Sequence, residues 1–261
     1  MAGLIEGKVA VITGAGSGAG LAATLLFVRH GARVVAVDPD STLVDSSVAI
    51  ARTQGGSAIA MTCDPADPAA IERIVQTTVE TYGRLDILYN NALAAPAETR
   101  RGLSALSEVA DEDFESRHGI NIVGIILACQ AAVRQFESQG GGGAIVNTAS
   151  VAGLEGLDGL VYGASHGAVV ELTRTLALEV AHKGIRVNSI CPSALLTGAA
   201  YTPAEDANIT GMAAMTPLGR VVTAEDCAHA ALFLASDLAA SITAVNLPVD
   251  AGLSGRLPLK K

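Results

Sequence analysis

Short runs rich in Val and Ile alternate along the chain with longer segments of helical periodicity, and this alternation limits the fold more than any other feature. Continuous apolar strands joined by helices form a parallel sheet that is covered on both faces. The pattern therefore predicts an α/β fold, a doubly wound (Rossmann) three-layer sandwich. The predicted strands are Val9–Thr13, Arg33–Asp38, Ser57–Cys63, Leu85–Tyr89, Ala144–Asn147, Arg186–Cys191 and Ala244–Val249, and the predicted helices are Gly18–His30, Pro68–Tyr82, Asp111–Glu137, Val161–Lys183 and Ala224–Ala235.

The chain is predicted to fold as one domain over residues 1–261, because this length suits a single α/β core and no repeat or low-complexity linker divides the sequence. Two segments, Leu93–Ala110 and Ser193–Leu218, are predicted to be mobile loops. The second suggests an apolar lid over the substrate at residues 193–218, although an ordinary surface loop explains it equally well. Its large apolar residues include Leu195, Leu196, Met212 and Met215.

Composition excludes several classes of protein. The 17 basic residues face 26 acidic ones, and the resulting net charge of −9 argues against nucleic acid as a partner. The apolar stretch Ile120–Val133 is expected to be too short to span a membrane, and the N-terminus lacks the apolar block of a signal peptide. We therefore expect a soluble protein of the reducing cytoplasm. The cysteines are too widely spaced for a disulfide framework or a zinc site: Cys63, Cys129, Cys191 and Cys227.

A glycine-rich segment follows the first predicted strand and opens the first helix. Residues 13–20 read Thr-Gly-Ala-Gly-Ser-Gly-Ala-Gly. Glycines permit a tight turn and a close backbone approach, and a helix N-terminus offers N–H groups and a positive dipole end to a pyrophosphate. The segment predicts a dinucleotide site, with a purely structural turn as the alternative.

Asp38 ends the second strand, 24 positions after Gly14. A carboxylate here accepts hydrogen bonds from ribose hydroxyls and repels a 2′-phosphate, which favours NAD over NADP. The alternative is an ordinary turn residue before Pro39.

Further motifs follow Asp38 in order: CDPAD at residues 63–67, NNA at 90–92, an Asn in a helix, a Ser before a Tyr, and NSICPS at 188–193. With these motifs the chain resembles the short-chain dehydrogenase/reductase family over nearly its whole length. The resemblance implies a seven-stranded parallel sheet, a nicotinamide cofactor across the strand ends, and hydride transfer between the cofactor and an alcohol or carbonyl. It also implies a homotetramer, paired through the helices that carry Asn121 and Tyr162. The positions that match the family's cofactor-binding residues are Gly14, Ser17, Gly18, Gly20, Asp38, Asp64, Asn91, Ala92, Pro192 and Thr197.

Three residues match the family's catalytic set. Ser150 corresponds to the serine that binds the substrate oxygen, Tyr162 to the tyrosine that moves the hydroxyl proton, and Asn121 to the asparagine of the proton relay. Each also has a structural alternative: a loop-starting hydroxyl, a helix-end aromatic and a satisfied core amide, respectively.

The fourth position departs from the family, because His166 stands where Tyr-x-x-x-Lys requires a lysine. Positions 162 and 166 share a helix face, so the imidazole is expected to point toward the tyrosine and the nicotinamide ribose. A histidine with a reference pKa of about 6.5 is mostly neutral at pH 7. Lowering a tyrosine pKa from about 10 to 7 takes about 4 kcal/mol, which a neutral imidazole does not easily supply. The alternative is a partly solvated helix residue in a site that no longer catalyses.

Smaller departures point the same way. The interval from Ser150 to Tyr162 is one residue shorter than usual, Leu93 and Ser193 replace glycines, and Pro65 lacks an N–H that normally reaches the adenine. Two hypotheses remain. The chain is an NAD-dependent oxidoreductase for a small or medium apolar alcohol or ketone, in which His166 substitutes for Lys. Alternatively it is a catalytically degenerate relative that binds a dinucleotide, or nothing, as a structural or regulatory subunit.

Overall fold

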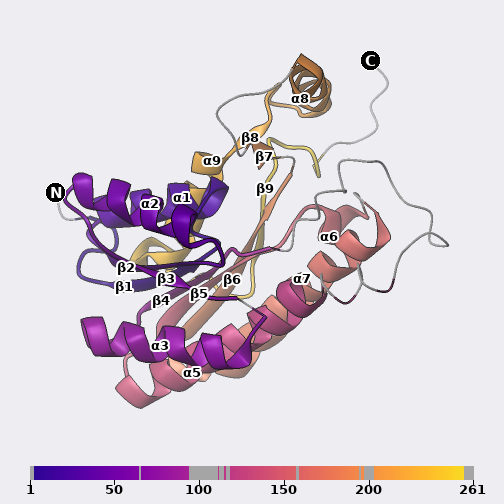
Figure 1. Cartoon of the computed structure of the whole chain (residues 1–261). Coiled ribbons are helices and arrows are strands. Elements are labelled where there is room, and N and C mark those ends of the chain that lie inside the picture. Colours follow the sequence, from indigo (N-terminus) through magenta and orange to yellow (C-terminus); the bar gives the residue numbers. More distant parts are fainter. Residues whose placement is uncertain are drawn as a thin grey trace.

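The computed structural model describes residues 3–64, 66–93, 111, 115, 118–156, 159–193, 195–196 and 203–255, without the side chains of 195–196 and 203–208. Seven parallel strands form the central sheet in the order β3-β2-β1-β4-β5-β6-β9 (Figure 1). This confirms the predicted α/β class and the parallel sheet. The strands are β1 (Val9–Thr13), β2 (Arg33–Asp38), β3 (Ser57–Thr62), β4 (Ile87–Asn90), β5 (Gly143–Thr148), β6 (Ile185–Pro192) and β9 (Asn246–Val249).

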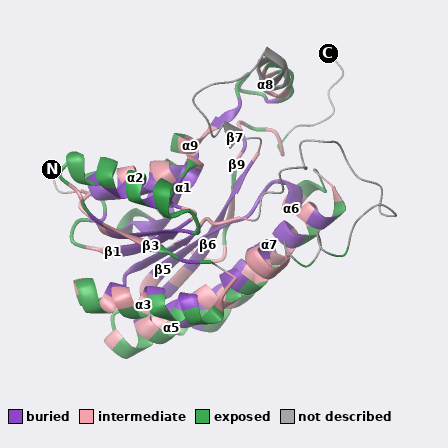
Figure 2. Cartoon of the chain, viewed as in Figure 1, coloured by how far each residue is buried: buried purple, intermediate pink, exposed green. Residues whose placement is uncertain are grey.

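Helices cover both faces of this sheet. On one face lie α1 (Gly18–Arg29), α2 (Ser41–Thr53) and α9 (Ala224–Ala235), and on the other lie α3 (Pro68–Tyr82), α5 (Ile125–Gln139) and α7 (Leu160–Val180) (Figure 1). Each face has its own hydrophobic cluster, and the strands between them are mostly buried (Figure 2). Because the strands are parallel, their carboxyl ends meet along one edge, where ligands bind in folds of this class.

Several elements differ from the sequence predictions. Helix α2 was not predicted; the Asp40 carboxylate caps its first turn by accepting from the N–H groups of Thr42 and Leu43. The segment Ser193–Leu218, predicted as a loop, contains helix α8 (Pro203–Met215), and β7 (Leu195–Leu196) pairs with β8 (Val222–Thr223). The predicted loop Leu93–Ala110 lies outside the described residues after Leu93. The remaining short elements are α6 (Ala152–Glu155) and the 3-10 turns η3 (Ala181–Lys183) and η4 (Asp237–Ala239).

The helix that was expected over Asp111–Glu137 begins its described continuous part with a π-helical segment, η2 (Gly119–Gly124), which runs into α5. Together they span 21 residues, Gly119–Gln139, which is long and apolar enough to cross a membrane by length and composition alone. The apolar stretch Ile120–Val133, expected to be too short to span a membrane, is thus part of a longer apolar helix. Half of its most apolar window is buried, and it packs against α3 and α7, so a membrane role has only weak support.

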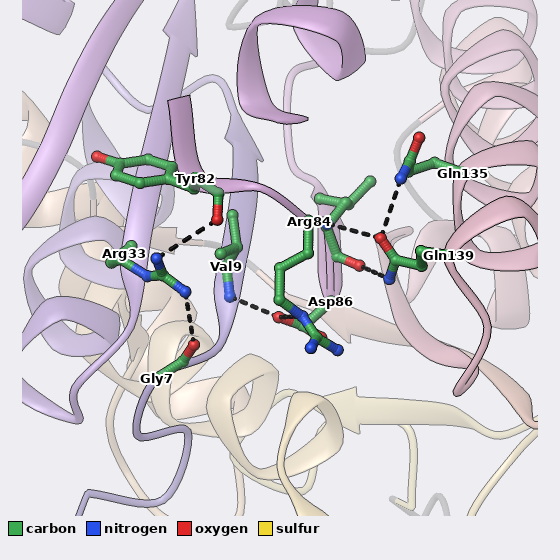
Figure 3. A network of polar contacts seen from close by, with 9 residues as sticks. Gly7, Val9, Arg33, Tyr82, Arg84, Asp86, Gln135 and Gln139 are labelled. Carbon is green, nitrogen blue, oxygen red and sulfur yellow. Dashed lines mark hydrogen bonds and ion pairs between the residues drawn. The ribbon is translucent and has the colours of Figure 1, made fainter. Parts of the chain in front are cut away.

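A polar network joins residues at the amino-terminal edge of the sheet (Figure 3). The buried Asp86 carboxylate accepts the Val9 N–H at 2.8 Å and pairs with Arg84, which joins the start of β1 to the start of β4. Arg33 donates to the carbonyls of Gly7 and Tyr82. The Gln139 side chain bonds both backbone groups of Leu85. These contacts hold the amino-terminal edge of the sheet together, and the candidate site lies at the carboxyl edge.

Candidate functional site

The glycine-rich segment forms a tight turn between β1 and α1. Gly14 adopts φ +65°, and a Cβ added at Gly20 would lie 1.9 Å from the Gly14 carbonyl oxygen, so α1 starts in direct backbone contact with the end of β1. Gly18 begins α1 after Ser17, whose side chain makes no capping hydrogen bond to the helix. The turn therefore presents the first N–H groups of α1 at the carboxyl edge, as a pyrophosphate site requires.

Asp38 lies beside this turn with 9% of its surface exposed. Its Oδ2 accepts the Gly16 N–H at 2.9 Å and its Oδ1 accepts the Asp40 N–H at 3.0 Å. A Cβ on Gly16 would approach the Asp38 carboxyl carbon to 2.9 Å. In the part of the chain that the structure describes, no Lys or Arg forms an ion pair with Asp38. The Asp38 carboxylate is thus fixed next to the turn by two backbone N–H groups.

The segment after β4 packs on the same turn. The N–H groups of Asn91 and Ala92 both donate to Thr13 Oγ1 at 3.0 Å, and Asn91 Nδ2 donates to the carbonyls of Thr13 and Gly14. The sequence reasoning missed Thr13, although its place as the last residue of β1, at the head of the glycine-rich segment, was available as a signal.

The other predicted cofactor residues are more scattered. Asp64 is exposed, and its carboxylate accepts the Ala66 N–H at 2.8 Å. Leu93 is half-buried. Thr197 and Pro65 lie outside the described residues. The glycine turn, the helix N-terminus and Asp38 nonetheless fit the adenosine and pyrophosphate half of NAD, because each offers the backbone space, N–H groups or acceptor that this half needs.

Asn121 is fully buried within the π-helical segment η2. Its Nδ2 donates to Ser165 Oγ at 3.3 Å, and the Ser165 hydroxyl donates to the Tyr162 carbonyl at 2.9 Å. Ser165 thereby joins η2 to the first turns of α7. It was not among the predicted residues, and its position three residues after Tyr162 was the only signal for it. Single π-helical turns inside α-helices often mark functional sites.

Ser150 follows β5 and is nearly buried. Its Oγ accepts the Ala152 N–H at 3.2 Å and donates to the Pro192 carbonyl at 3.5 Å, which joins the ends of β5 and β6. Helix α6 then crosses α7 so closely that a Cβ on Gly153 would lie 2.5 Å from the backbone carbon of His166. Ser150 and the Tyr162–His166 pair are therefore brought to the same end of the sheet.

His166 is fully buried, with 0% exposure, so the hypothesis of a partly solvated residue was wrong. Its ring lies 4.3 Å from the Tyr162 ring, centroid to centroid, which agrees with the shared helix face. Neither ring nitrogen has a hydrogen-bond partner among the described groups. Burial lowers the pKa of His166 to about 4, because an imidazolium would lose its hydration there. At pH 7 the side chain is neutral.

This burial predicts a pH-dependent stability. The unfolded chain binds a proton at His166 below its ordinary pKa of about 6.5, whereas the folded chain does so only near pH 4, so the free energy of unfolding should fall by about 3 kcal/mol as pH drops from 6.5 to 4. Urea unfolding at several pH values, with His166→Leu compared with the native chain, measures this contribution. His229→Gln, at an exposed histidine, is the matched control and should keep the native slope. An identical pH slope in His166→Leu would contradict the burial argument.

Comparisons with known proteins agree with this geometry. A family model described as "Enoyl-(Acyl carrier protein) reductase" matches residues 14–254. D-threitol dehydrogenase of Mycolicibacterium smegmatis is 36% identical over 249 residues, which cover 95% of this chain and 93% of that protein.

Two solved structures have a TM-score of 0.88 to this chain. One is a putative short-chain dehydrogenase/reductase from Burkholderia xenovorans, 36% identical, covering 98% of this chain and 100% of its own. The other is carveol dehydrogenase from Mycobacterium avium in complex with NAD, 28% identical, covering 97% of this chain and 100% of its own.

Proposed function

Since the chain belongs to the short-chain dehydrogenase/reductase family, we propose that it is an NAD-dependent oxidoreductase that interconverts an alcohol and a ketone. The observation that carries the proposal is the Asp38 carboxylate held by the Gly16 N–H beside the glycine turn, where it can accept hydrogen bonds from the adenosine ribose. When bound, NAD accepts the hydride from the alcohol, or NADH returns it to the ketone.

The chain's own residues would position the substrate oxygen and move its proton. Tyr162 is the proposed acid/base, and Ser150 orients the substrate oxygen by a hydrogen bond. Asn121 holds a relay water. His166 stands where the family has Lys, but as a neutral group it supplies no charge to lower the pKa of the Tyr162 phenol. Proton removal from an alcohol would then be favoured at alkaline pH, nearer the ordinary tyrosine pKa of about 10.

We further propose that residues 1–261 act as one dinucleotide-binding and catalytic domain, with residues 193–218 as the substrate loop. A small-molecule alcohol without an anionic group is the proposed substrate. One relative is named for D-threitol and one structural neighbour for carveol, so a first panel should contain both polyols and apolar secondary alcohols.

We also propose that the protein is a homotetramer in the reducing cytoplasm. Val123 and Ile126 on η2 and α5, and Leu160 and Leu178 on α7, are exposed apolar side chains, and Leu178 is 76% exposed. Such surfaces on these two helices support a homotetramer of 26.3 kDa subunits. The four cysteines are buried and free, in keeping with the reducing cytoplasm.

A catalytically degenerate dinucleotide-binding subunit remains the second candidate. The observation that favours it is the buried neutral His166, because a neutral imidazole at position 166 does not supply the charge on which the family's proton transfer depends.

The cofactor assignment predicts that NADH binds at least tenfold more tightly than NADPH, because a 2′-phosphate would meet the nearly buried Asp38 carboxylate. Titration of NADH and NADPH fluorescence measures both affinities. Asp38→Ala should narrow the ratio, whereas Asp45→Ala, at an exposed carboxylate on α2, should leave it unchanged. Equal affinities for the two cofactors in the native chain would refute the assignment.

The catalytic assignment predicts that His166→Lys raises turnover at neutral pH by ten- to a thousandfold. A lysine starts from a reference pKa of about 10.4, so it keeps its positive charge beside Tyr162 through a burial shift that leaves the imidazole neutral. The measurement is single-turnover hydride transfer to NAD from the alcohol panel. A thermal melt within a few degrees of the native one establishes that the Lys variant is folded. If the folded Lys variant transfers no hydride from any alcohol in the panel, the degenerate subunit is the better account.

A further inference from the structure

The Asn91 side chain, which follows β4, connects the ends of β1, β4 and β5 next to the glycine-rich turn. Its Nδ2 donates to the Thr13 carbonyl at 3.2 Å and to the Gly14 carbonyl at 3.3 Å. Both of these partners are acceptors only, so the amide must present its nitrogen to the turn. The amide oxygen, Oδ1, therefore points to the other side and needs its own donor.

Two hydroxyl groups meet that need. Tyr89 on β4 donates to Asn91 Oδ1 at 3.2 Å, and Thr148 at the end of β5 lies within reach of both: its Oγ1 is 3.3 Å from the Tyr89 hydroxyl and 3.5 Å from Asn91 Oδ1. The Thr148 hydroxyl has one proton and can donate to only one of the two at a time. With Tyr89 in place, its nearer acceptor is the tyrosine oxygen.

The Tyr89 hydroxyl keeps its proton and therefore remains a hydrogen-bond donor. The side chain is fully buried, and its ring stacks on Phe27 of α1 with centroids 6.4 Å apart. Burial raises the pKa of the Tyr89 phenol far above its ordinary value, so the proton stays on the oxygen throughout the working pH range. No part of the proposed catalytic cycle uses this residue.

The turn that Asn91 holds has little freedom. A Cβ on Gly14 would lie 2.9 Å from the Ala92 Cα and 3.0 Å from Asn91 Nδ2, so the segment after β4 is in direct contact with the turn. A turn that is already fixed loses less conformational entropy when a pyrophosphate binds, and affinity rises accordingly. If the Asn91 amide were less firmly held, the turn would lose more conformational entropy when the pyrophosphate binds, and affinity would fall.

We propose that Tyr89 and Thr148 are positioning residues for the dinucleotide: their hydroxyl groups satisfy Asn91 Oδ1 and so hold the amide that fixes the glycine-rich turn. This inference rests on the proposed NAD binding. It assigns a role to two buried residues that do not themselves reach the cofactor.

The test compares NADH affinity, by fluorescence titration, in variants that remove the hydroxyls with little change of shape. Tyr89→Phe keeps the ring, and Thr148 can then turn its proton to Asn91 Oδ1, so NADH should bind no more than about threefold more weakly. Thr148→Val alone should have a similarly small effect. The double variant leaves Oδ1 without either donor and should weaken binding by more than tenfold, beyond the product of the single effects. Tyr82→Phe, which removes a surface hydroxyl, is the control and should bind as the native chain does.

Two further measurements distinguish positioning of the dinucleotide site from a general structural role: rescue of NADH affinity by a retained hydroxyl, and the kinetic constants. In the Tyr89→Phe background, Thr148→Ser retains a hydroxyl and should restore most of the affinity that Thr148→Val loses; this pair also serves if the Thr148→Val double variant folds poorly. With an active substrate, the KM for NAD should rise while kcat and the KM for the alcohol stay unchanged. Native-like NADH affinity in a folded double variant would overturn this inference alone. Failure of the native chain to bind NADH would overturn the proposed function together with it.

Discussion

The site depends on the direct backbone contact between the start of α1 and the end of β1. A side chain at Gly20 would collide with the Gly14 carbonyl, so only glycine allows the helix to approach the strand this closely. The contact sets where the first N–H groups of α1 point. It also places the turn between Asp38, at the end of β2, and Asn91, after β4. Parallel pairing of these three strands brings the pieces to one edge, although they are far apart in the sequence.

The two proposed halves of the site differ in what they offer to the family's chemistry. The proposed cofactor half has the glycine turn, the Asp38 carboxylate and the hydrogen-bonded Asn91. The proposed catalytic half retains Asn121, Ser150 and Tyr162 but has a buried neutral imidazole at position 166. Lowering a tyrosine pKa by 3 units takes about 4 kcal/mol, and no cation at position 166 contributes to it. We therefore expect dinucleotide binding and catalysis to respond to different substitutions in this chain.

Much of the fold followed from periodicity. The bounds of α3 and α9 were predicted to the residue, as were those of β1 and β2, because each combines a regular apolar pattern with a clear start or end. Helix α2 was missed because its sequence is rich in Ser and Thr and it buries only a narrow stripe. Helix α8 was missed because Gly, Pro and Thr in Ser193–Leu218 are typical of loops.

Features of the site that depend on contacts between distant segments could not be predicted. The burial of His166 depends on α6 crossing α7 at Gly153, a contact that no local pattern encodes. Likewise, the approach of Tyr89 and Thr148 to Asn91 depends on the register of β4 and β5, in which Tyr89 pairs with Val146 and Asn90 with Asn147. Local sequence identified the residue types that carry the proposed chemistry, and the tertiary structure determined which of them are neutral, buried or held in place.

The central claim, that position 166 holds a buried neutral imidazole, is tested most directly by the ring nitrogen resonances of His166. An NMR titration of the folded chain, with the signal assigned by its loss in His166→Gln, gives both the pKa and the tautomer. The account predicts a neutral ring throughout the neutral range and a pKa of about 4. A titration midpoint at or above the ordinary histidine value of about 6.5 would contradict it, because the imidazole would then be solvated or paired with an anion.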